Sequence, residues 1–197
     1  MKTMLSYFIT LMIFLNLIAA PAFAAEYSID PDHSMLSFQV RHLLSKVSGR
    51  FKDFEGNVSF DEKKPDFAKV KVTAKAASID TSIEKRDTHL RSADFFDVEK
   101  FPALSFEGKK LTATGDKKMK LEGNLTIHGV TKPVTFDIDY LGADKDPAGR
   151  VRAGFTATTK INRKDYGLMW NKTLESGNLL VGDEVTITTD IEAIEKK

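Results

Sequence analysis

The chain has 197 residues, of which 42% are hydrophobic, and it carries 29 basic and 28 acidic side chains and no cysteine. This near balance removes the electrostatic argument for binding nucleic acid or an anionic membrane surface. Because no disulfide can form, a hydrophobic core must stabilise the fold, and the length is ample for one domain with such a core.

The first 24 residues have the pattern of a secretory signal peptide. Lys2 is their only charged residue, an apolar run extends from Leu5 to Ala20, and Ala22-Phe23-Ala24 offers a small-residue cleavage site. The apolar run is short for an uncleaved membrane anchor. We therefore expect residues 1–24 to be removed and residues 25–197 to form a single exported domain without stable membrane insertion.

Alternating apolar and polar residues predict β-strands in the first half of this domain. Residues 34–41 alternate strictly, which is typical of a half-buried strand. Residues 47–60 alternate as well, but the phase slips by one residue, and this slip predicts a β-bulge near Lys52-Asp53. The composition of residues 61–66 predicts a turn. Another strand, over residues 70–78, follows it.

One helical segment interrupts the strands. Thr81 and Glu84 have the spacing of a capping box, in which each side chain accepts from a backbone amide of the other residue. A helix of about two or three turns is expected to follow, with Asp87 and Arg91 paired on its exposed side. An aromatic elbow with Phe95, Phe96 and Phe101 comes next. Pro102 favours an extended conformation for Phe101, and this predicts the start of a strand.

The second half shows four further alternating segments, over residues 118–127, 133–140, 151–161 and 185–191. Short connections rich in turn-forming residues join most of them, which predicts hairpins. The longest irregular stretch, residues 162–182, contains the only tryptophan. About eight strands without helical connectors favour an antiparallel architecture over a parallel one.

A sandwich and a closed barrel both satisfy this pattern. Several positions on the predicted inward faces are small, and they are Gly49, Gly56, Ala74, Ala76, Gly123, Ala153 and Ala157. An eight-stranded barrel can hold side chains or one small ligand. The small residues therefore favour a barrel with space inside over a solid sandwich.

Motifs for catalysis and for metal binding are absent from the sequence. The four histidines lack the usual spacing of metal ligands, and no cysteine accompanies them. The chain contains no G-x-S-x-G elbow, no G-x-G-x-x-G fingerprint and no P-loop. We therefore expect no catalytic residue, no metal, no cofactor and no nucleic-acid partner.

Short motifs of a known family run along almost the whole domain. They are Asp32-His-Ser34 before Phe38-x-Val40-x-His42, Gly49-Arg-Phe51, Ser78-Ile-x-Thr81, Arg86-Asp-x-His-Leu90 through Ser92-x-Asp-Phe-Phe-Asp97, Phe101-Pro102, Leu125-Thr-Ile-His-Gly-Val-Thr131, Ile161-Asn-Arg-x-Asp-Tyr-Gly167 and Gly182-Asp-x-Val185. With these motifs the chain resembles the YceI-like family, the polyisoprenoid-binding periplasmic proteins with a lipocalin-like barrel. Tyr166 departs from the pattern, because the family often has phenylalanine there.

The resemblance implies an all-β fold: an extended eight-stranded antiparallel β-barrel with one or two short helices. It implies that an apolar pore holds an isoprenoid or a related long-chain lipid in the periplasm, for binding, transport or storage without chemistry. Two alternatives stay open, namely an enzyme acting on a prenyl or quinone substrate in the same cavity and a structural barrel without ligand. A homodimer is also left open.

The residues expected near the ligand fall into two groups. Those expected along the pore are Phe38, Val40, Phe54, Val72, Phe95, Phe96, Phe101, Phe106, Leu121, Phe136, Phe155, Tyr166 and Trp170. Arg86, His89 and Arg91 are expected at its mouth, where they would meet an anionic headgroup. The competing interpretation is a solvated helix face whose charges pair with Glu84 and Asp87.

Overall fold

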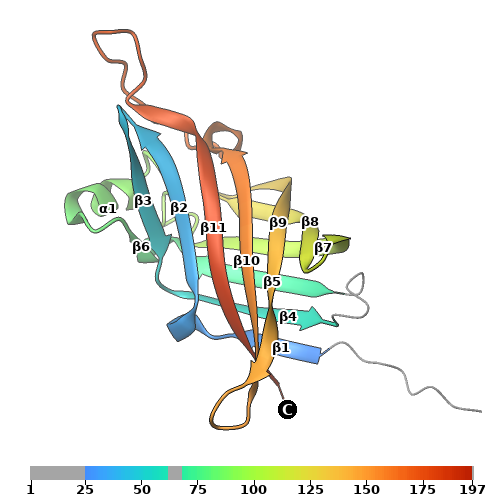
Figure 1. Ribbon diagram of the computed structural model, residues 1–197. Coiled ribbons are helices and arrows are strands. Elements are labelled where there is room, and N and C mark those ends of the chain that lie inside the picture. Colours follow the sequence, from blue (N-terminus) through green and yellow to red (C-terminus); the bar gives the residue numbers. More distant parts are fainter. Residues whose placement is uncertain (1–24, 62–67, 197) are drawn as a thin grey trace, which may run out of the picture.

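A computed structural model describes residues 25–61 and 68–196 (Figure 1). The predicted signal peptide and most of the predicted turn at residues 61–66 lie outside the described residues. The described strands are β1 (Ala25–Ile29), β2 (Met35–His42), β3 (Ser45–Phe51), β4 (Phe54–Phe60), β5 (Lys69–Lys75), β6 (Ile79–Asp80), β7 (Ala103–Gly115), β8 (Lys118–Ile127), β9 (Val130–Lys145), β10 (Val151–Asn162) and β11 (Val181–Glu195).

One α-helix, α1 (Glu84–Arg91), accompanies the strands in the described part of the chain. The described 3-10 helices are η1 (Pro31–His33), η3 (Ala76–Ser78) and η4 (Arg163–Tyr166). Neither α1 nor these short helices are long and apolar enough to cross a bilayer.

All eleven strands belong to one sheet, and strand β11 closes it into a barrel. One edge of β11 pairs with β10, while the other edge pairs first with β2 and then, near its end, with β1. The ring β1-β4-β5-β7-β8-β9-β10-β11 is therefore closed, with every pairing antiparallel. The structure confirms the predicted eight-stranded antiparallel barrel with one short α-helix.

The phase slip in the sequence pattern before β4 corresponds to a bend that separates two strands, β3 and β4. The predicted β-bulge is therefore wrong. Strand β3 ends at Phe51, which pairs with Leu36 of β2, and β4 begins at Phe54, which pairs with Ala74 of β5. The chain thus changes partners across Lys52-Asp53, and the alternation restarts because the second strand has its own orientation.

The start of α1 also differs from the prediction. Its N-cap position is Ile83, which makes no side-chain cap, so Thr81 and Glu84 do not form a capping box. Thr81 instead donates its backbone amide and its hydroxyl to Asp87, a carboxylate that is buried and needs donors. Because Asp87 is engaged there, Arg91 pairs with Glu84 at 3.0 Å.

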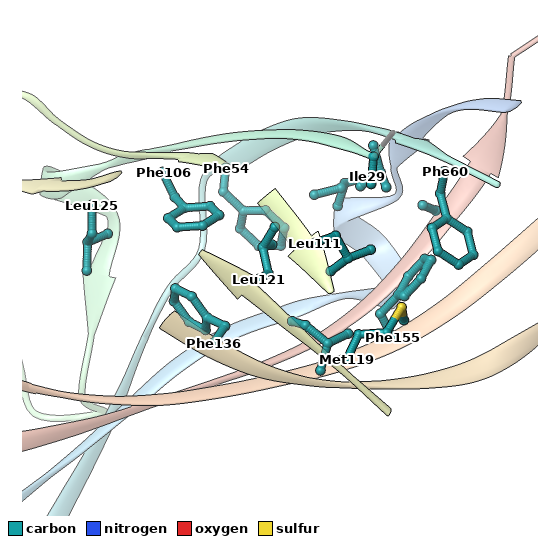
Figure 2. Packing of buried hydrophobic residues seen from close by; sticks show 14 of the residues in the cluster. Ile29, Phe54, Phe60, Phe106, Leu111, Met119, Leu121, Leu125, Phe136 and Phe155 are labelled. Carbon is teal, nitrogen blue, oxygen red and sulfur yellow. The ribbon is translucent and has the colours of Figure 1, made fainter. Parts of the chain in front are cut away.

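Strand β1 and the C-terminus lie at one end of the barrel (Figure 1), and buried apolar side chains pack against one another inside it there. The ring centroid of Phe60 lies 5.1 Å from that of Tyr140 and 5.4 Å from that of Phe155. Figure 2 shows Ile29, Leu111 and other apolar side chains from facing strands directed toward one another inside the barrel. Several of these side chains, among them Ile29, Phe60 and Phe155, also line the cavity inside the barrel.

Candidate functional site

An internal cavity of about 640 Å³ lies within the barrel. Its size falls within the range of about 300–1,000 Å³ that is usual for ligand pockets. Inward-facing residues from both halves of the barrel line it, and most of them are apolar. An apolar enclosure of this kind accepts hydrocarbon and rejects water-soluble polar molecules, because a polar group buried there would lose its hydrogen bonds.

The structure brings most of the predicted residues to this cavity. Those that line it are Phe38, Val40, Val72, Arg86, His89, Phe95, Phe96, Phe106, Leu121, Phe136, Phe155 and Trp170. The aromatic elbow after α1 therefore contributes to the wall through Phe95 and Phe96. Edge contacts join this elbow to the barrel, because the ring centroid of Phe96 lies 5.7 Å from that of Phe51.

Four predicted residues do not line the cavity. Phe54 is buried in the core beside Phe106 (Figure 2), while Tyr166 is buried in η4. The ring of Phe101 packs against His128 with a centroid distance of 4.4 Å. Arg91 is partly buried and donates to the backbone carbonyls of Ala77 and Ile79. Arg86 and His89 thus line the cavity as predicted for the mouth. Arg91 pairs with Glu84, as the competing interpretation of a paired helix face expects.

Sequence reasoning missed several lining residues, and the missed apolar ones include Leu36, Phe51, Val58, Phe60, Val70 and Leu168. The strand members among them share the inward phase of the predicted residues, so alternation alone could have found them. Arg163 is a different case. It follows the end of β10 and belongs to no alternating pattern, so only its place in the family motif signalled it.

The space above three of the small inward residues is already filled. A Cβ on Gly49 would lie 2.4 Å from the ring of Phe38, and one on Gly123 would lie 2.5 Å from the ring of Phe106. At Gly56 the neighbour is Ile29. These glycines admit side chains rather than a ligand, whereas Ala74 and Ala157 do line the cavity.

Polar groups enter the cavity wall mainly from α1 and from the segment after β10. The Arg86 guanidinium donates to the hydroxyl and to the carbonyl of Thr81, both at 2.7 Å. His89 pairs with Asp94 through Nε2 at 2.9 Å, and its ring is half-exposed. The positive charge of Arg86 therefore lies at the helix side of the cavity, held by hydrogen bonds within the chain.

An aromatic cluster joins α1 to the segment before β11. The ring of His89 meets the rings of Phe95 and Trp170 edge-on, with centroid distances of 5.1 and 4.8 Å. Next to Trp170, the Asn171 amide donates to the carbonyl of Val181, and Val181 pairs with His42 of β2. We use the term mouth for the cavity-lining residues along these contacts and at the start of α1, which are His42, Ile83, Lys85, His89, Trp170 and Val181.

Arg163 stabilises one side of the mouth. Its guanidinium donates to the carbonyls of Leu168, Trp170 and Gly182, with distances of 2.9 Å to the latter two, and lies 3.3 Å from Asp183. The side chain is buried, and burial lowers the pKa of its guanidinium while the charge of Asp183 opposes that shift. Four acceptors around one buried cation hold residues 168–170 against the start of β11.

A second polar group lies at the opposite end, where Asp30, His33 and Glu192 come within 4.8 Å of one another. Metal ligation would compete there with Arg152, whose Nη1 donates to both carboxylates and so neutralises them. Arg152 also contacts Asp146 of the β9–β10 turn at 3.1 Å. We interpret this cluster as a set of ion pairs that holds the β9–β10 turn, η1 and β11 together.

The fold and the cavity define a lipocalin-like β-barrel protein with a mainly apolar interior cavity. The chain belongs to the YceI-like family, whose YceI-like domain matches residues 27–193. A UPF0312 protein of Pseudomonas putida is 46% identical over 153 residues, which are 76% of this chain and 80% of that protein.

Solved structures share the same fold. The YCEI protein of Campylobacter jejuni is 35% identical with a TM-score of 0.70, over 80% of this chain and 90% of that one. A polyisoprenoid binding domain from Saccharophagus degradans, implicated in plant cell wall breakdown, is 18% identical with a TM-score of 0.61, over 88% of this chain and 99% of that one. At that identity, the second likeness concerns the fold alone.

Proposed function

We propose that this protein binds an isoprenoid or a related long-chain lipid in its barrel and carries or stores it in the periplasm. One observation carries the proposal: the cavity lining is mainly apolar, and its charged residues Lys85, Arg86 and Arg163 come from α1 and from the segment after β10. This polarity matches a ligand with a long hydrocarbon chain and a polar end. A solved relative of the same fold is named as a polyisoprenoid binding domain, which supports the ligand class.

Hydrocarbon burial is sufficient for retention. Each buried CH₂ contributes about 0.8 kcal/mol, so ten buried carbons contribute about 8 kcal/mol before the cost of ordering the chain. The signal-peptide pattern of residues 1–24 supports a periplasmic location. In that aqueous compartment a long-chain lipid has no other apolar environment between the membranes.

The polar groups of the cavity wall support a binding function without catalysis. Arg86, His89 and Arg163 are each engaged with another group of the chain, through Thr81, Asp94 and the carbonyls of the mouth. The sequence contains no recognised catalytic motif beside them. We therefore propose that these side chains hold the mouth in shape and that the arginines present positive charge to the polar end of the ligand.

Native mass spectrometry and organic extraction of protein purified from the periplasm test this function. We expect one long-chain lipid per barrel. Ala157→Phe places a ring in the cavity and is expected to abolish retention of the lipid. Thr158→Phe is the matched control, because the next residue of the strand points to the other face. A wild-type protein that is free of lipid, or equal retention by both variants, contradicts the proposal.

A further inference from the structure

The turn between β2 and β3 exposes two leucines beside the mouth. Leu44 has a relative exposure of 104%, and Leu43 has one of 41%. His42 and Val47, which lie just before and just after this turn, both line the cavity. The turn therefore lies at the edge of the cavity, and its two leucines contribute little to the core.

The backbone of this turn makes the choice of leucine more unusual. His42 pairs with Ser45, so the loop has only two residues, and Leu43 adopts a φ of 51°. Asparagine and glycine are favoured in such turns because they tolerate positive φ, whereas a bulky side chain there is strained. Leucine at this position costs conformational energy and exposes apolar surface. A contact outside the chain explains it better than the fold does.

Other exposed apolar side chains gather at the same end. Ile83 is 52% exposed and lines the mouth, and Met169, which is 60% exposed, lies between the cavity-lining residues Leu168 and Trp170. Two further large hydrophobic residues in the described part of the chain are exposed away from the mouth, namely Met35 and Leu141. Most of the exposed large apolar side chains therefore surround the opening.

Basic side chains lie directly behind the leucines. Arg41 and Lys46 face each other across β2 and β3, and Lys85 lines the mouth. Within residues 25–61 and 68–196, no ion pair involves any of these three cations. The chain as a whole is nearly neutral, so any attraction to an anionic surface comes from this local group. Apolar residues in front of basic ones match the interface of an anionic bilayer.

We propose that the Leu43-Leu44 turn docks the barrel on an anionic phospholipid bilayer and so brings the mouth to the lipid. The inference rests on the proposed function, because a lipid carrier must exchange its ligand with a membrane. A bilayer fits better than a protein partner, because a two-residue tip is small compared with the roughly 800 Å² that each side of a stable protein interface buries.

Sedimentation with vesicles of phosphatidylethanolamine and phosphatidylglycerol tests the docking. The variant Leu43→Asn/Leu44→Gly gives the turn its favoured residues, so it is expected to fold at least as stably as the wild type. Its vesicle affinity should fall about ten-fold or more, because two apolar side chains are lost from the interface. Lys46→Gln should lower the affinity about five-fold. Leu141→Gln, an exposed leucine elsewhere on the barrel, should leave it unchanged.

Lipid extraction from the same preparations separates this proposal from the proposed function. If the protein carries lipid but does not bind vesicles, or if the double variant binds like the wild type, docking is overturned and the carrier function stands. If the turn is needed for vesicle binding but no preparation contains lipid, the carrier function fails and docking stands. Light scattering that shows a wild-type dimer and a monomeric double variant, without vesicle binding, assigns the turn to self-association and overturns docking.

Discussion

Thr81 and Asp87 form the hydrogen-bonded junction between the sheet and α1. The Thr81 amide donates to Asp87 Oδ1 at 3.0 Å, and the Thr81 hydroxyl donates to the same oxygen. The hydroxyl also accepts from Arg86 at 2.7 Å, so the junction fixes a cavity-lining cation. Thr81 and Asp87 are both buried, so water cannot satisfy their polar groups and these hydrogen bonds must do so.

Replacing Asp87 is therefore expected to destabilise the protein in a graded way. Asp87→Ala leaves two buried donors of Thr81 without an acceptor and should cost about 3 kcal/mol. Asp87→Asn keeps an oxygen in the same place and should cost about 1 kcal/mol, because only the charge is lost. Urea unfolding measures both. Thr88→Ala on the exposed side of α1 is the control, and equal losses for all three variants refute the assignment.

Arg163→Lys should loosen the mouth. A lysine ammonium cannot donate to the carbonyls of Leu168, Trp170 and Gly182 with the geometry of a guanidinium. We therefore expect the free energy of unfolding to fall by about 3 kcal/mol. Amide hydrogen exchange at residues 168–170 should also become faster. Lys164→Arg, which keeps its pairing with Asp183, is the control. Unchanged exchange at these amides would show that Arg163 does not hold the segment.

Tyr166→Phe should stabilise the protein. The Tyr166 hydroxyl is buried and has no hydrogen-bond partner among the described residues, and burial raises its pKa to about 12, with a smaller contribution from the charge of Asp165. Removing an unsatisfied hydroxyl while keeping the ring should increase the free energy of unfolding by about 1 kcal/mol. Thermal and urea unfolding check this. A decrease in stability would mean that the hydroxyl makes a bond with water.

Asp146 should make the stability depend on pH in the acid range. The backbone amide of Arg150 and the guanidinium groups of Arg152 and Arg150 lower its pKa well below the ordinary value of 3.8. A group with a lowered pKa in the folded state contributes stability at neutral pH, and this contribution is lost as the pH falls below about 4.

Asp146→Asn should therefore be less stable than the wild type at pH 7, and the difference between the two should shrink toward pH 2. Urea midpoints across this range measure the effect. Asp144→Asn, in the same β9–β10 hairpin, is the control because, among the described residues, its carboxylate accepts only from the amide of Lys145. A difference between wild type and Asp146→Asn that is constant with pH would rule out the linkage.

The local pattern of the sequence by itself determined most of the strands, the helix α1 and most of the aromatic wall, but it missed β1 and joined β3 to β4. Side chains alternate between the two faces of a strand, so Phe38, Phe106 and Phe136 could be placed inside before any partner strand was known. The elbow residues Phe95 and Phe96 were also found, because they belong to the densest family motif. These inferences needed only neighbours along the chain or a known pattern.

Contacts between distant residues were decided by the tertiary structure alone. Thr81 bonds Asp87 in place of a capping box, Arg163 reaches three carbonyls from outside any strand, and Phe101 packs outside the cavity on His128. The glycine at position 123 makes room for a neighbouring ring, which composition cannot distinguish from room for a ligand. Periodicity assigns a side chain to a face, but only the closed sheet decides what occupies the space that it faces.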